Sequence, residues 1–370
     1  MMRVSVAIPS HRYAAFIEAG LLRRCGQQLS KLLNGSHPQL FVVTVPPVRR
    51  RWGALLLKSL SRAGFRARVL EMADGEPHKK LSTVQGMAEK LSAAGADRDA
   101  VILAFGGGVV GDTVGLLASL YMRGVHLIHI PTTLQAQVDA SIGGKTGVNL
   151  AAGKNLLGTF HQPLAVFIDP AVLSTLPDRE FRAGLYECLK CGAIGNPKLF
   201  RKLESTQVKQ LRNNPEALRY VITESVKLKA KIVAADERES GLRRVLNFGH
   251  TIGHALEAES AYHRFLHGEA VGWGMIAASN IAESMGYCDK RTRQRISEAV
   301  LSLGPLPKVK ARSSKLLGFL RTDKKTRDGR LHFVLPRAIG KVEIANTVPD
   351  HAVTEAIQSL RQLSQSSDPE

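Results

Sequence analysis

Hydrophobic residues in the first half of the chain form short runs that are separated by longer amphipathic stretches. The runs are rich in β-branched and other apolar residues, as buried strands are. The stretches between them, such as residues 51–63 and 82–94, repeat their apolar positions with helical spacing. This alternation favours a mostly parallel sheet with helices on both faces. The predicted strands are residues 40–45, 101–105, 125–130 and 165–168.

The second half of the chain has a different pattern, because the strand signal fades from about Leu173. A break at residues 169–177, which holds two prolines, marks the predicted boundary. We therefore predict an α/β nucleotide-binding domain over residues 1–172 and an all-α metal- and substrate-binding domain over residues 173–370. The predicted helices of the second domain are residues 178–194, 215–235, 251–260, 269–285 and 290–303.

Composition narrows the class of protein. With 370 residues, of which 44% are hydrophobic, the chain suits two packed domains, and disordered or collagen-like classes are set aside. The net charge of +19 fits nucleic acid, anionic lipid or an anionic substrate. No stretch approaches the roughly 18 apolar residues of a membrane span, and residues 1–13 lack the apolar core of a signal peptide. We therefore expect a cytoplasmic protein with no membrane contact.

The four cysteines are too few and too scattered for a disulfide framework, which fits a reducing compartment. Cys188 and Cys191 form a C-x-x-C pair. Half of a zinc site and a redox pair are the functional interpretations of such a pair. Because the chain has no second C-x-x-C, we interpret the two as small buried residues one helical turn apart.

A glycine-rich turn follows the predicted strand that ends at Phe105. Residues 106–112 read GGGVVGD and precede a helical run, so they match G-x-G-x-x-G with a strand before and a helix after. Glycines let the backbone approach a phosphate, and the N–H groups at a helix N-terminus favour an anion. No acidic residue follows about 20 positions later, where an ordinary Rossmann site offers one to the ribose. The sequence predicts a phosphate- or dinucleotide-binding turn, but not standard Rossmann topology.

Histidines and one glutamate predict a metal site. His250 and His254 are four residues apart, hence on one face of a helix, and His267 begins a later helical run. Glu187 lies among small and apolar helix residues, where a carboxylate is costly unless it is paired or binds a cation. Taken singly, a helix glutamate is more often solvated, and an isolated H-x-x-x-H is a weak signal. Catalytic zinc takes three protein ligands and keeps one position open, which Glu187, His250 and His267 would satisfy.

Basic and amide side chains gather around these motifs. Residues 139–163 are rich in glycine and follow neither periodicity, so we predict a loop there. Further cations lie on the helix of Glu187 and before His250. Arginine clamps carboxylate or phosphate in a bidentate manner and lysine is a mobile charge, so the gathering indicates a substrate with several negative groups. The residues are Lys145, Lys154, Asn155, Lys190, Lys229, Arg243 and Asn247.

A second basic segment, residues 308–330, raises the alternative of a nucleic-acid-binding protein. The segment contains Asp323 and Asp328, and Phe319 is its one aromatic residue, so stacking on bases is poorly supported. We therefore expect no nucleic-acid partner.

Several motifs occur in an order that resembles the 3-dehydroquinate synthase family of the sugar phosphate cyclases. They read DASIGGKTGVN, GKNLLGTFHQP, AGLYECLK, KAKIVAADERESGLRRVLNFGHTIGHALE and LHGEAV, and the likeness covers nearly the whole chain. The resemblance implies a shikimate-pathway lyase that converts 3-deoxy-D-arabino-heptulosonate 7-phosphate to 3-dehydroquinate and phosphate. It also implies NAD, one divalent cation (zinc or cobalt) and a homodimer. The implied steps are transient oxidation by NAD, phosphate elimination, return of the hydride and intramolecular aldol closure.

The resemblance implies roles for individual residues as well. The implied metal ligands are again Glu187, His250 and His267. The implied NAD contacts are Glu76, Lys79, Gly107, Gly108, Asp112, Thr132, Thr133, Asp139, Lys145 and Lys154. The implied substrate contacts are Arg123, Lys145, Lys154, Asn155, Lys190, Lys229, Arg243, Asn247 and one of Lys324 or Lys325. The implied catalytic residues are Lys145, Asn155, Lys190, Arg243 and His254, the last as a proton carrier.

The sequence departs from the family pattern at one point. After the first predicted strand the family usually has Asp or Asn for the adenosine ribose, whereas Thr44 is followed here by Val45 and two prolines. The alternative functions are those of another sugar phosphate cyclase or of a metal-dependent alcohol or glycerol dehydrogenase. A dehydrogenase would leave the cations Lys154, Lys190 and Arg243 unexplained.

Overall fold

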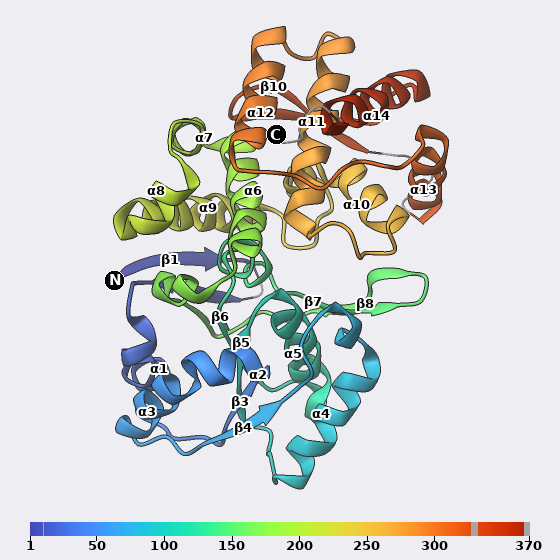
Figure 1. Cartoon of the computed structure of the whole chain (residues 1–370). Helices are drawn as coiled ribbons and strands as arrows, with labels where there is room; N and C mark the ends of the chain where they lie inside the picture. Colours follow the sequence, from blue (N-terminus) through green and yellow to red (C-terminus); the bar gives the residue numbers. More distant parts are fainter. Residues whose placement is uncertain (10, 327–331, 366–370) are drawn as a thin grey trace. The chain divides into compact units, whose positions relative to one another are not determined.

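The computed structural model describes residues 1–9, 11–326 and 332–365, with the side chains of residues 321–326 excepted. The chain divides into two compact units (Figure 1). Unit 1 consists of Met1–Pro177 and Pro215–Arg238, and unit 2 of Asp178–Asn214 and Glu239–Glu370.

This division differs from the predicted border after residue 172. Unit 1 continues to Pro177, and it also includes α9 (Pro215–Ala235), which the sequence pattern had grouped with the later helices. The reason is packing, because α9 covers β1 (Met2–Ala7) and η5 (Ala136–Ala140) of unit 1. Helical spacing of apolar residues indicates that a segment has an apolar face, but it does not indicate which neighbouring element buries that face.

Unit 1 is built on a seven-stranded sheet with the order β1-β2-β9-β6-β5-β3-β4. Neighbouring strands are parallel except for β1 and β2, which form an antiparallel hairpin at one edge. The remaining strands run β4-β3-β5-β6-β9, so the order reverses between β3 and β5. This is the flavodoxin-like order of a doubly wound sheet and not the Rossmann order, as the missing acidic residue indicated.

The helices and strands of unit 1 are β1, β2 (Arg12–Ile17), η1 (Leu21–Arg24), α1 (Cys25–Leu32), β3 (Leu40–Thr44), α2 (Pro46–Val48), η2 (Arg49–Gly53), α3 (Ala54–Arg62), β4 (Ala67–Glu71), η3 (Glu76–His78), α4 (Leu81–Ala93), β5 (Val101–Gly106), α5 (Gly108–Leu120), η4 (Tyr121–Arg123), β6 (His126–Pro131), η5, β7 (Lys145–Leu150), β8 (Gly153–Phe160), β9 (Ala165–Ile168), η6 (Pro170–Thr175) and α9.

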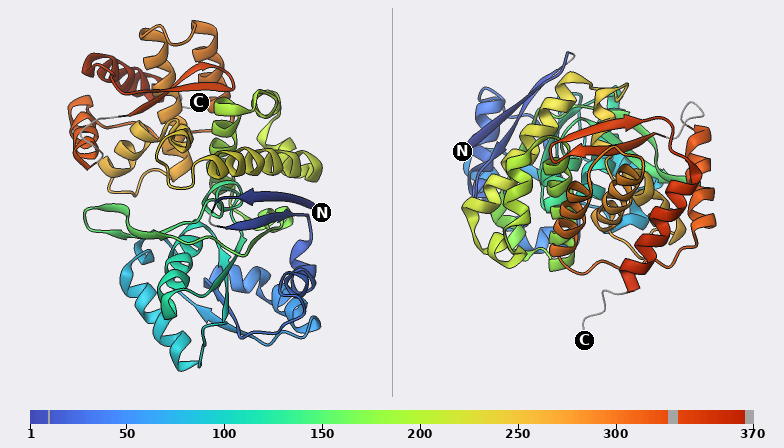
Figure 2. Two further views of the ribbon diagram at one scale, coloured as in Figure 1. Left: turned by 180° about the vertical axis from the view of Figure 1, so that it is seen from behind. Right: turned by 90° about the horizontal axis from the view of Figure 1, so that it is seen from above.

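The central strands of this sheet are buried on both faces. On β3, Phe41 and Val43 point into one core with residues of α4 and α5, while Leu40 and Val42 point into another with residues of α1 and α3. Figures 1 and 2 show these two pairs of helices on opposite faces of the sheet. Burial on both faces explains why the four predicted strands, now β3, β5, β6 and β9, appear as continuous apolar runs.

The loop predicted over residues 139–163 was wrong. Most of it is the antiparallel hairpin β7–β8, which Figure 1 shows as a separate ribbon beside α5. The hairpin is held to α5 by a chain of hydroxyl groups: Oγ1 of Thr146 lies 2.8 Å from Oγ1 of Thr159, which donates to Oγ of Ser119 at 2.8 Å. Glycines at three positions of the two strands hide the strand period, and β8 is mostly exposed, so no apolar alternation marks it.

Unit 2 is mainly helical, as predicted, although it also contains a small hairpin of β10 and β11 that the sequence pattern did not reveal. Cys188 and Cys191 are buried in α6 and form no disulfide, which confirms their interpretation as packed helix residues. Among the described residues of both units, no helix is long and apolar enough to span a membrane. The elements of unit 2 are α6 (Asp178–Gly195), α7 (Pro197–Glu204), α8 (Val208–Asn213), η7 (Leu242–Asn247), α10 (His250–Glu259), α11 (His267–Ser284), α12 (Lys290–Ser302), α13 (Ser313–Thr326), β10 (Phe333–Ala338), β11 (Lys341–Ala345) and α14 (Asp350–Gln365).

Candidate active site

The glycine turn of unit 1 lies between the end of β5 and the start of α5. Gly107 is the N-cap residue of α5, as the strand–turn–helix pattern predicted. Oγ1 of Thr44, at the end of β3, donates to the carbonyl oxygen of Phe105 at 2.7 Å, so the ends of β3 and β5 are tied together. These are the strands between which the order reverses, and ligands of doubly wound sheets bind outside that point.

Residues next to the turn are arranged around it. The N–H of Thr132 donates to the carbonyl oxygen of Gly106 at 2.9 Å. Thr133 lies against Gly107, where an added Cβ would stand 3.0 Å from Cγ2 of the threonine. Val45, the departure from the family pattern, is buried in the core with 3% of its surface exposed. Its side chain therefore packs against apolar neighbours.

A network of hydrogen bonds connects the loop before α4, the first turn of α5 and the β7–β8 hairpin. Nζ of Lys79 donates to the carboxylate of Asp112 and, at 2.5 Å, to Oδ1 of Asn155. Nδ2 of Asn149 donates to Oε1 of Glu76 at 2.8 Å, and its Oδ1 accepts from the backbone N–H of Asn155 at 3.0 Å. The structure thus brings four of the predicted site residues together, and Asn149 joins them.

Lysine and carboxylate side chains lie close together in this network. Nζ of Lys154 lies 3.8 Å from Oε1 of Glu76. Burial raises the pKa of Asp112, and the ammonium of Lys79 opposes that shift. A second pair forms near η5, where Nζ of Lys229 donates to the backbone oxygen and to Oδ1 of Asp139 at 2.7 and 2.6 Å. The ammonium groups of Lys79 and Lys229 each lie against one of these carboxylates, so these residues form a polar surface of fixed geometry.

Two further predicted residues of unit 1, Arg123 and Lys145, lie on η4 and on β7. Arg123 is on η4, the short helix that follows the C-terminal end of α5, whereas Asp112 is near the start of α5. The structure of unit 1 therefore does not bring Arg123 to the glycine turn. Lys145 is the exposed first residue of β7.

Three helices of unit 2 pack closely enough to share one polar cluster. α11 meets α6 at Gly268, where an added Cβ would stand 1.9 Å from the carbonyl oxygen of Ala183. It meets α10 at Gly274, where a Cβ would stand 1.8 Å from the carbonyl oxygen of Gly249. Only glycine permits backbones to approach so closely. The predicted ligands lie on these three helices.

The predicted ligands converge. Oε1 of Glu187 lies 3.4 Å from Nε2 of His267 and 3.8 Å from Nε2 of His250. Ligands that bind one cation in a tetrahedron at about 2.1 Å are separated by about 3.4 Å, so the spacing suits zinc or a similar ion. His254 completes the group, because a ring nitrogen from each of the three histidines lies within 4.8 Å of the others.

The imidazoles of His250 and His267 are each held in place by a contact at Nδ1, the ring nitrogen that does not face Glu187. Nδ1 of His250 lies 3.2 Å from the carbonyl oxygen of Phe248, and Nδ1 of His267 lies 3.1 Å from Oε2 of Glu257. An oxygen acceptor at Nδ1 fixes the proton there and leaves Nε2 as the metal-binding nitrogen. In each ring it is Nε2 that faces Glu187.

The carboxylate of Glu187 is the best test of whether these residues fit a cation. It is 1% exposed, and neither of its oxygens accepts a hydrogen bond of normal geometry from the described residues, although Nζ of Lys190 lies 2.5 Å from Oε2. A buried carboxylate without hydrogen bonds is costly. A cation against Oε1 would satisfy it, so the residues present fit a divalent metal.

Electrostatic effects at the cluster favour the ligand forms of Glu187 and His250, but not that of His267. Burial would raise the pKa of Glu187, but Lys190 and the imidazoles hold it well below its usual range. Burial, helped by Lys190, holds the pKa of His250 well below its usual value, so that ring is neutral. At His267, burial is outweighed by Glu257 and Glu187, and the pKa is raised to about 10. Binding of a cation at its Nε2 must therefore release a proton.

Three predicted substrate residues lie on α6 and on η7. Lys190 is buried beside Glu187, and Arg243, at 2% exposure, lies on η7, which contacts α6. Nδ2 of Asn247 donates to Oε1 of Glu239 at 2.6 Å. The side chains of Lys324 and Lys325 lie outside the part of the chain that the structure describes.

Sequence reasoning missed Asn149, Glu239 and Glu257. Each holds a predicted residue in place, but each stands alone in the sequence with no spacing that marks it. Their roles depend on contacts that form only after folding.

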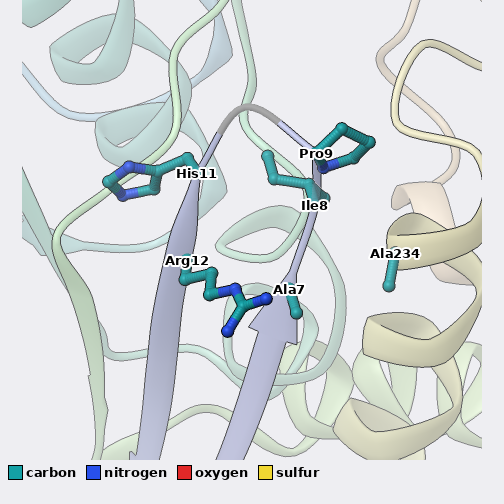
Figure 3. Close-up of a pocket in the computed structure, with 6 residues that line it drawn as sticks. All are labelled: Ala7, Ile8, Pro9, His11, Arg12 and Ala234. Carbon is teal, nitrogen blue, oxygen red and sulfur yellow. The ribbon is translucent and has the colours of Figure 1, made fainter.

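A separate hollow of about 600 Å³ in unit 1 holds none of the predicted residues. It lies between the β1–β2 turn and the C-terminal part of α9 (Figure 3) and is lined by Ala7, Ile8, Pro9, His11, Arg12 and Ala234. The imidazole of His11 points away from Ala234, and its Nε2 lies 3.1 Å from the carbonyl oxygen of Pro163.

Solved structures of similar fold include sugar phosphate cyclases that share a quarter to a third of their residues with this chain. The chain is similar to 2-epi-5-epi-valiolone synthase from Streptomyces hygroscopicus subsp. jinggangensis, solved with NAD⁺ and Zn²⁺ bound, with a TM-score of 0.88 and 32% identity over 96% of this chain and 99% of that chain. It is also similar to 2-deoxy-scyllo-inosose synthase complexed with carbaglucose-6-phosphate, NAD⁺ and Co²⁺, with a TM-score of 0.86 and 27% identity over 97% and 100% of the two chains. The fold is that of a sugar phosphate cyclase, as predicted.

Sequence comparison defines the family. Residues 69–183 match the model of the 3-dehydroquinate synthase N-terminal region, and residues 184–326 match that of the C-terminal region. A 3-dehydroquinate synthase of Koribacter versatilis is 51% identical over 364 residues, which are 98% of this chain and 99% of that protein. The chain belongs to the 3-dehydroquinate synthase family. The predicted resemblance is confirmed.

Proposed function

We propose that this protein converts 3-deoxy-D-arabino-heptulosonate 7-phosphate to 3-dehydroquinate and phosphate, with NAD and one divalent cation, zinc or cobalt. The observation that supports this proposal most directly is that the buried carboxylate of Glu187 faces Nε2 of His250 and Nε2 of His267. The chain also belongs to the 3-dehydroquinate synthase family. The solved relatives that bind NAD⁺ together with Zn²⁺ or Co²⁺ support the choice of cofactors.

Unit 1 holds the dinucleotide in this proposal. The glycine turn lies where doubly wound sheets bind ligands, and the N-terminal end of α5 favours the pyrophosphate. The network of Lys79 and Asp112 fixes the polar surface beside it. The proposed NAD contacts are those implied by the family: Glu76, Lys79, Gly107, Gly108, Asp112, Thr132, Thr133, Asp139, Lys145 and Lys154.

Unit 2 holds the cation through Glu187, His250 and His267. When bound, the cation supplies Lewis-acid polarisation of a substrate oxygen, and NAD supplies acceptance and later return of a hydride. The ketone formed by oxidation acidifies the neighbouring C–H, so the C–O bond to phosphate on the next carbon can break by elimination. Because the hydride returns, the reaction has no net redox change.

The chain's own cations bind and orient the substrate. Arg243 suits bidentate contact with a carboxylate, and Lys190 adds a second buried positive charge. Asn247 is held by Glu239, and His254 moves a proton at the reacting centre. The departing phosphate can itself take the acidified proton, so a strong protein base is not needed. We further propose Arg123, Lys145, Lys154, Asn155, Lys229 and one of Lys324 or Lys325 as substrate contacts, as the family resemblance implies.

We also propose a cytoplasmic homodimer that binds no nucleic acid. The scattered thiols and the family resemblance support the location and the assembly, respectively.

The proposal is tested by phosphate release from the heptulosonate phosphate with NAD present, before and after removal of metal by a chelator. We expect release to fall to background and to return with Zn²⁺ or Co²⁺, while NADH does not accumulate. Phosphate release that is indifferent to both the chelator and NAD would contradict it.

The same assay separates the alternatives. A dehydrogenase would accumulate one NADH per turnover and release no phosphate. A cyclase of different specificity would release phosphate faster from a neutral sugar phosphate than from the carboxylated heptulosonate.

A further inference from the structure

We propose that Glu257 is a positioning residue for the metal ligand His267. This inference rests on the proposed function, because it assumes that His267 binds a divalent cation. Glu257 would act through the imidazole and not through contact with the cation or the substrate.

The carboxylate of Glu257 contacts the imidazole of His267. Its Oε2 lies 3.1 Å from Nδ1 of His267, and the opposite ring nitrogen, Nε2, lies 3.4 Å from Oε1 of Glu187. The imidazole therefore stands between two carboxylates. The carboxylate of Glu257 accepts a hydrogen bond from the ring, and the carboxylate of Glu187 shares the predicted metal site with the ring.

The burial of Glu257 makes this arrangement specific. The residue is on α10 and only 1% exposed, whereas His267 begins α11. A carboxylate buried so deeply is costly unless charge-assisted hydrogen bonds satisfy it. Its contact with a ring on another helix also fixes the orientation of that ring, since His267 is the first residue of its helix and has only one helical neighbour along the chain to restrain it.

The imidazoles of His250 and His267 differ in the kind of oxygen that lies near Nδ1. Nδ1 of His250 lies 3.2 Å from a backbone oxygen of Phe248, two residues earlier on the chain. Nδ1 of His267 relies on a side chain ten residues away. A carboxylate acceptor makes the opposite nitrogen a stronger donor to a metal than a carbonyl acceptor does. Glu257 therefore determines both the tautomer and the basicity of His267.

The test is Co²⁺ affinity, measured by competition with a chelator on the full-length protein, together with the visible absorption spectrum of the bound cobalt. We expect Glu257→Ala to raise the Kd for Co²⁺ about 10- to 100-fold. In Glu257→Gln the amide oxygen can still accept from Nδ1, so a smaller rise is expected. Both variants should shift or weaken the cobalt absorption bands, because one ligand has lost its orientation or its donor strength.

Glu259→Gln is the matched control. Glu259 is on the same helix, but it pairs with Lys315 at 3.1 Å and with Arg264 at 3.6 Å and has no contact with the histidines among the described residues. Its variant should keep the wild-type Kd and spectrum. If Glu257→Ala does not fold, the near-isosteric Glu257→Gln decides the question.

The outcomes distinguish this inference from the proposed function. Wild-type protein that fails to bind Co²⁺ overturns the proposed function. Wild-type protein that binds Co²⁺, with a Glu257→Gln variant of unchanged Kd and spectrum, overturns the positioning role alone. A lower unfolding midpoint with unchanged cobalt binding would likewise show that Glu257 is merely structural.

Discussion

The polar groups at the predicted sites of the two units differ in their hydrogen bonds. In unit 1, Lys79 donates to both Asp112 and Asn155, and Glu76 accepts from Asn149. In unit 2, Glu187 is buried, and its oxygens face an ammonium and two imidazoles without a hydrogen bond of normal geometry from the part of the chain that the structure describes. A satisfied network holds a surface ready for a ligand, whereas an unsatisfied buried carboxylate marks the place that a cation would fill.

The largest expected effect is on the rate of phosphate release, and it tests the buried carboxylate of Glu187 in unit 2. Glu187→Gln removes the negative ligand and leaves Lys190 buried without its counter-charge. We expect phosphate release to fall roughly a thousand-fold, since Lewis-acid stabilisation amounts to several kcal/mol. Metal content of the purified protein, measured alongside the rate, should fall with it. The control is Glu343→Gln, which removes an exposed carboxylate that pairs with Arg337 in the same unit. Full metal content in Glu187→Gln would refute the ligand assignment.

A smaller effect is expected in the network of unit 1. Lys79→Met removes the donor shared by Asp112 and Asn155, while the apolar part of the side chain is largely kept. Hydrogen bonds to charged groups contribute about 1.5–3 kcal/mol, so the Kd for NAD should rise roughly ten- to hundredfold. Titration calorimetry measures this directly. The exposed neighbour Lys80→Met should bind NAD like the wild type, and equal affinities for all three proteins would remove Lys79 from the site.

The smallest effect concerns the stability of unit 1 in acid. His129 on β6 is buried, and burial, together with His161, lowers its pKa to about 4 from 6.5. The folded state therefore keeps His129 neutral while the unfolded chain takes up a proton, so stability is present above about pH 6.5 and is lost as the pH falls toward 4. Between pH 7 and 5.5 the loss should be about 1 kcal/mol.

His129→Gln should reduce this acid-dependent loss. The measurement is urea unfolding at both pH values with a chelator present, so that metal binding makes no contribution. The exposed His126 of the same strand, changed to Gln, is the control. An identical change in unfolding free energy for wild type and His129→Gln would contradict the assignment.

Much of the fold follows from local patterns. Strands were predicted at residues 40–45, 101–105, 125–130 and 165–168, each bound within one residue of the observed one, because both faces of these strands are buried and their sequences are apolar throughout. Helix α9 was predicted at residues 215–235, with the same bounds as in the structure. The hairpins β1–β2, β7–β8 and β10–β11 were not predicted, because glycine, short length and one-sided exposure weaken the period of two.

For the candidate site, the sequence by itself determined which chemical groups are present and which share a helix. It placed His250 and His254 one turn apart and put glycines where a strand turns into a helix. Only the tertiary structure decided which groups meet. Glu187 and His267 are 80 positions apart on the chain, and their 3.4 Å approach depends on close packing of α11 against α6 and α10. The physical reason is that local sequence sets backbone preference and amphipathic faces, whereas the partners of a buried charge are chosen by packing among distant segments.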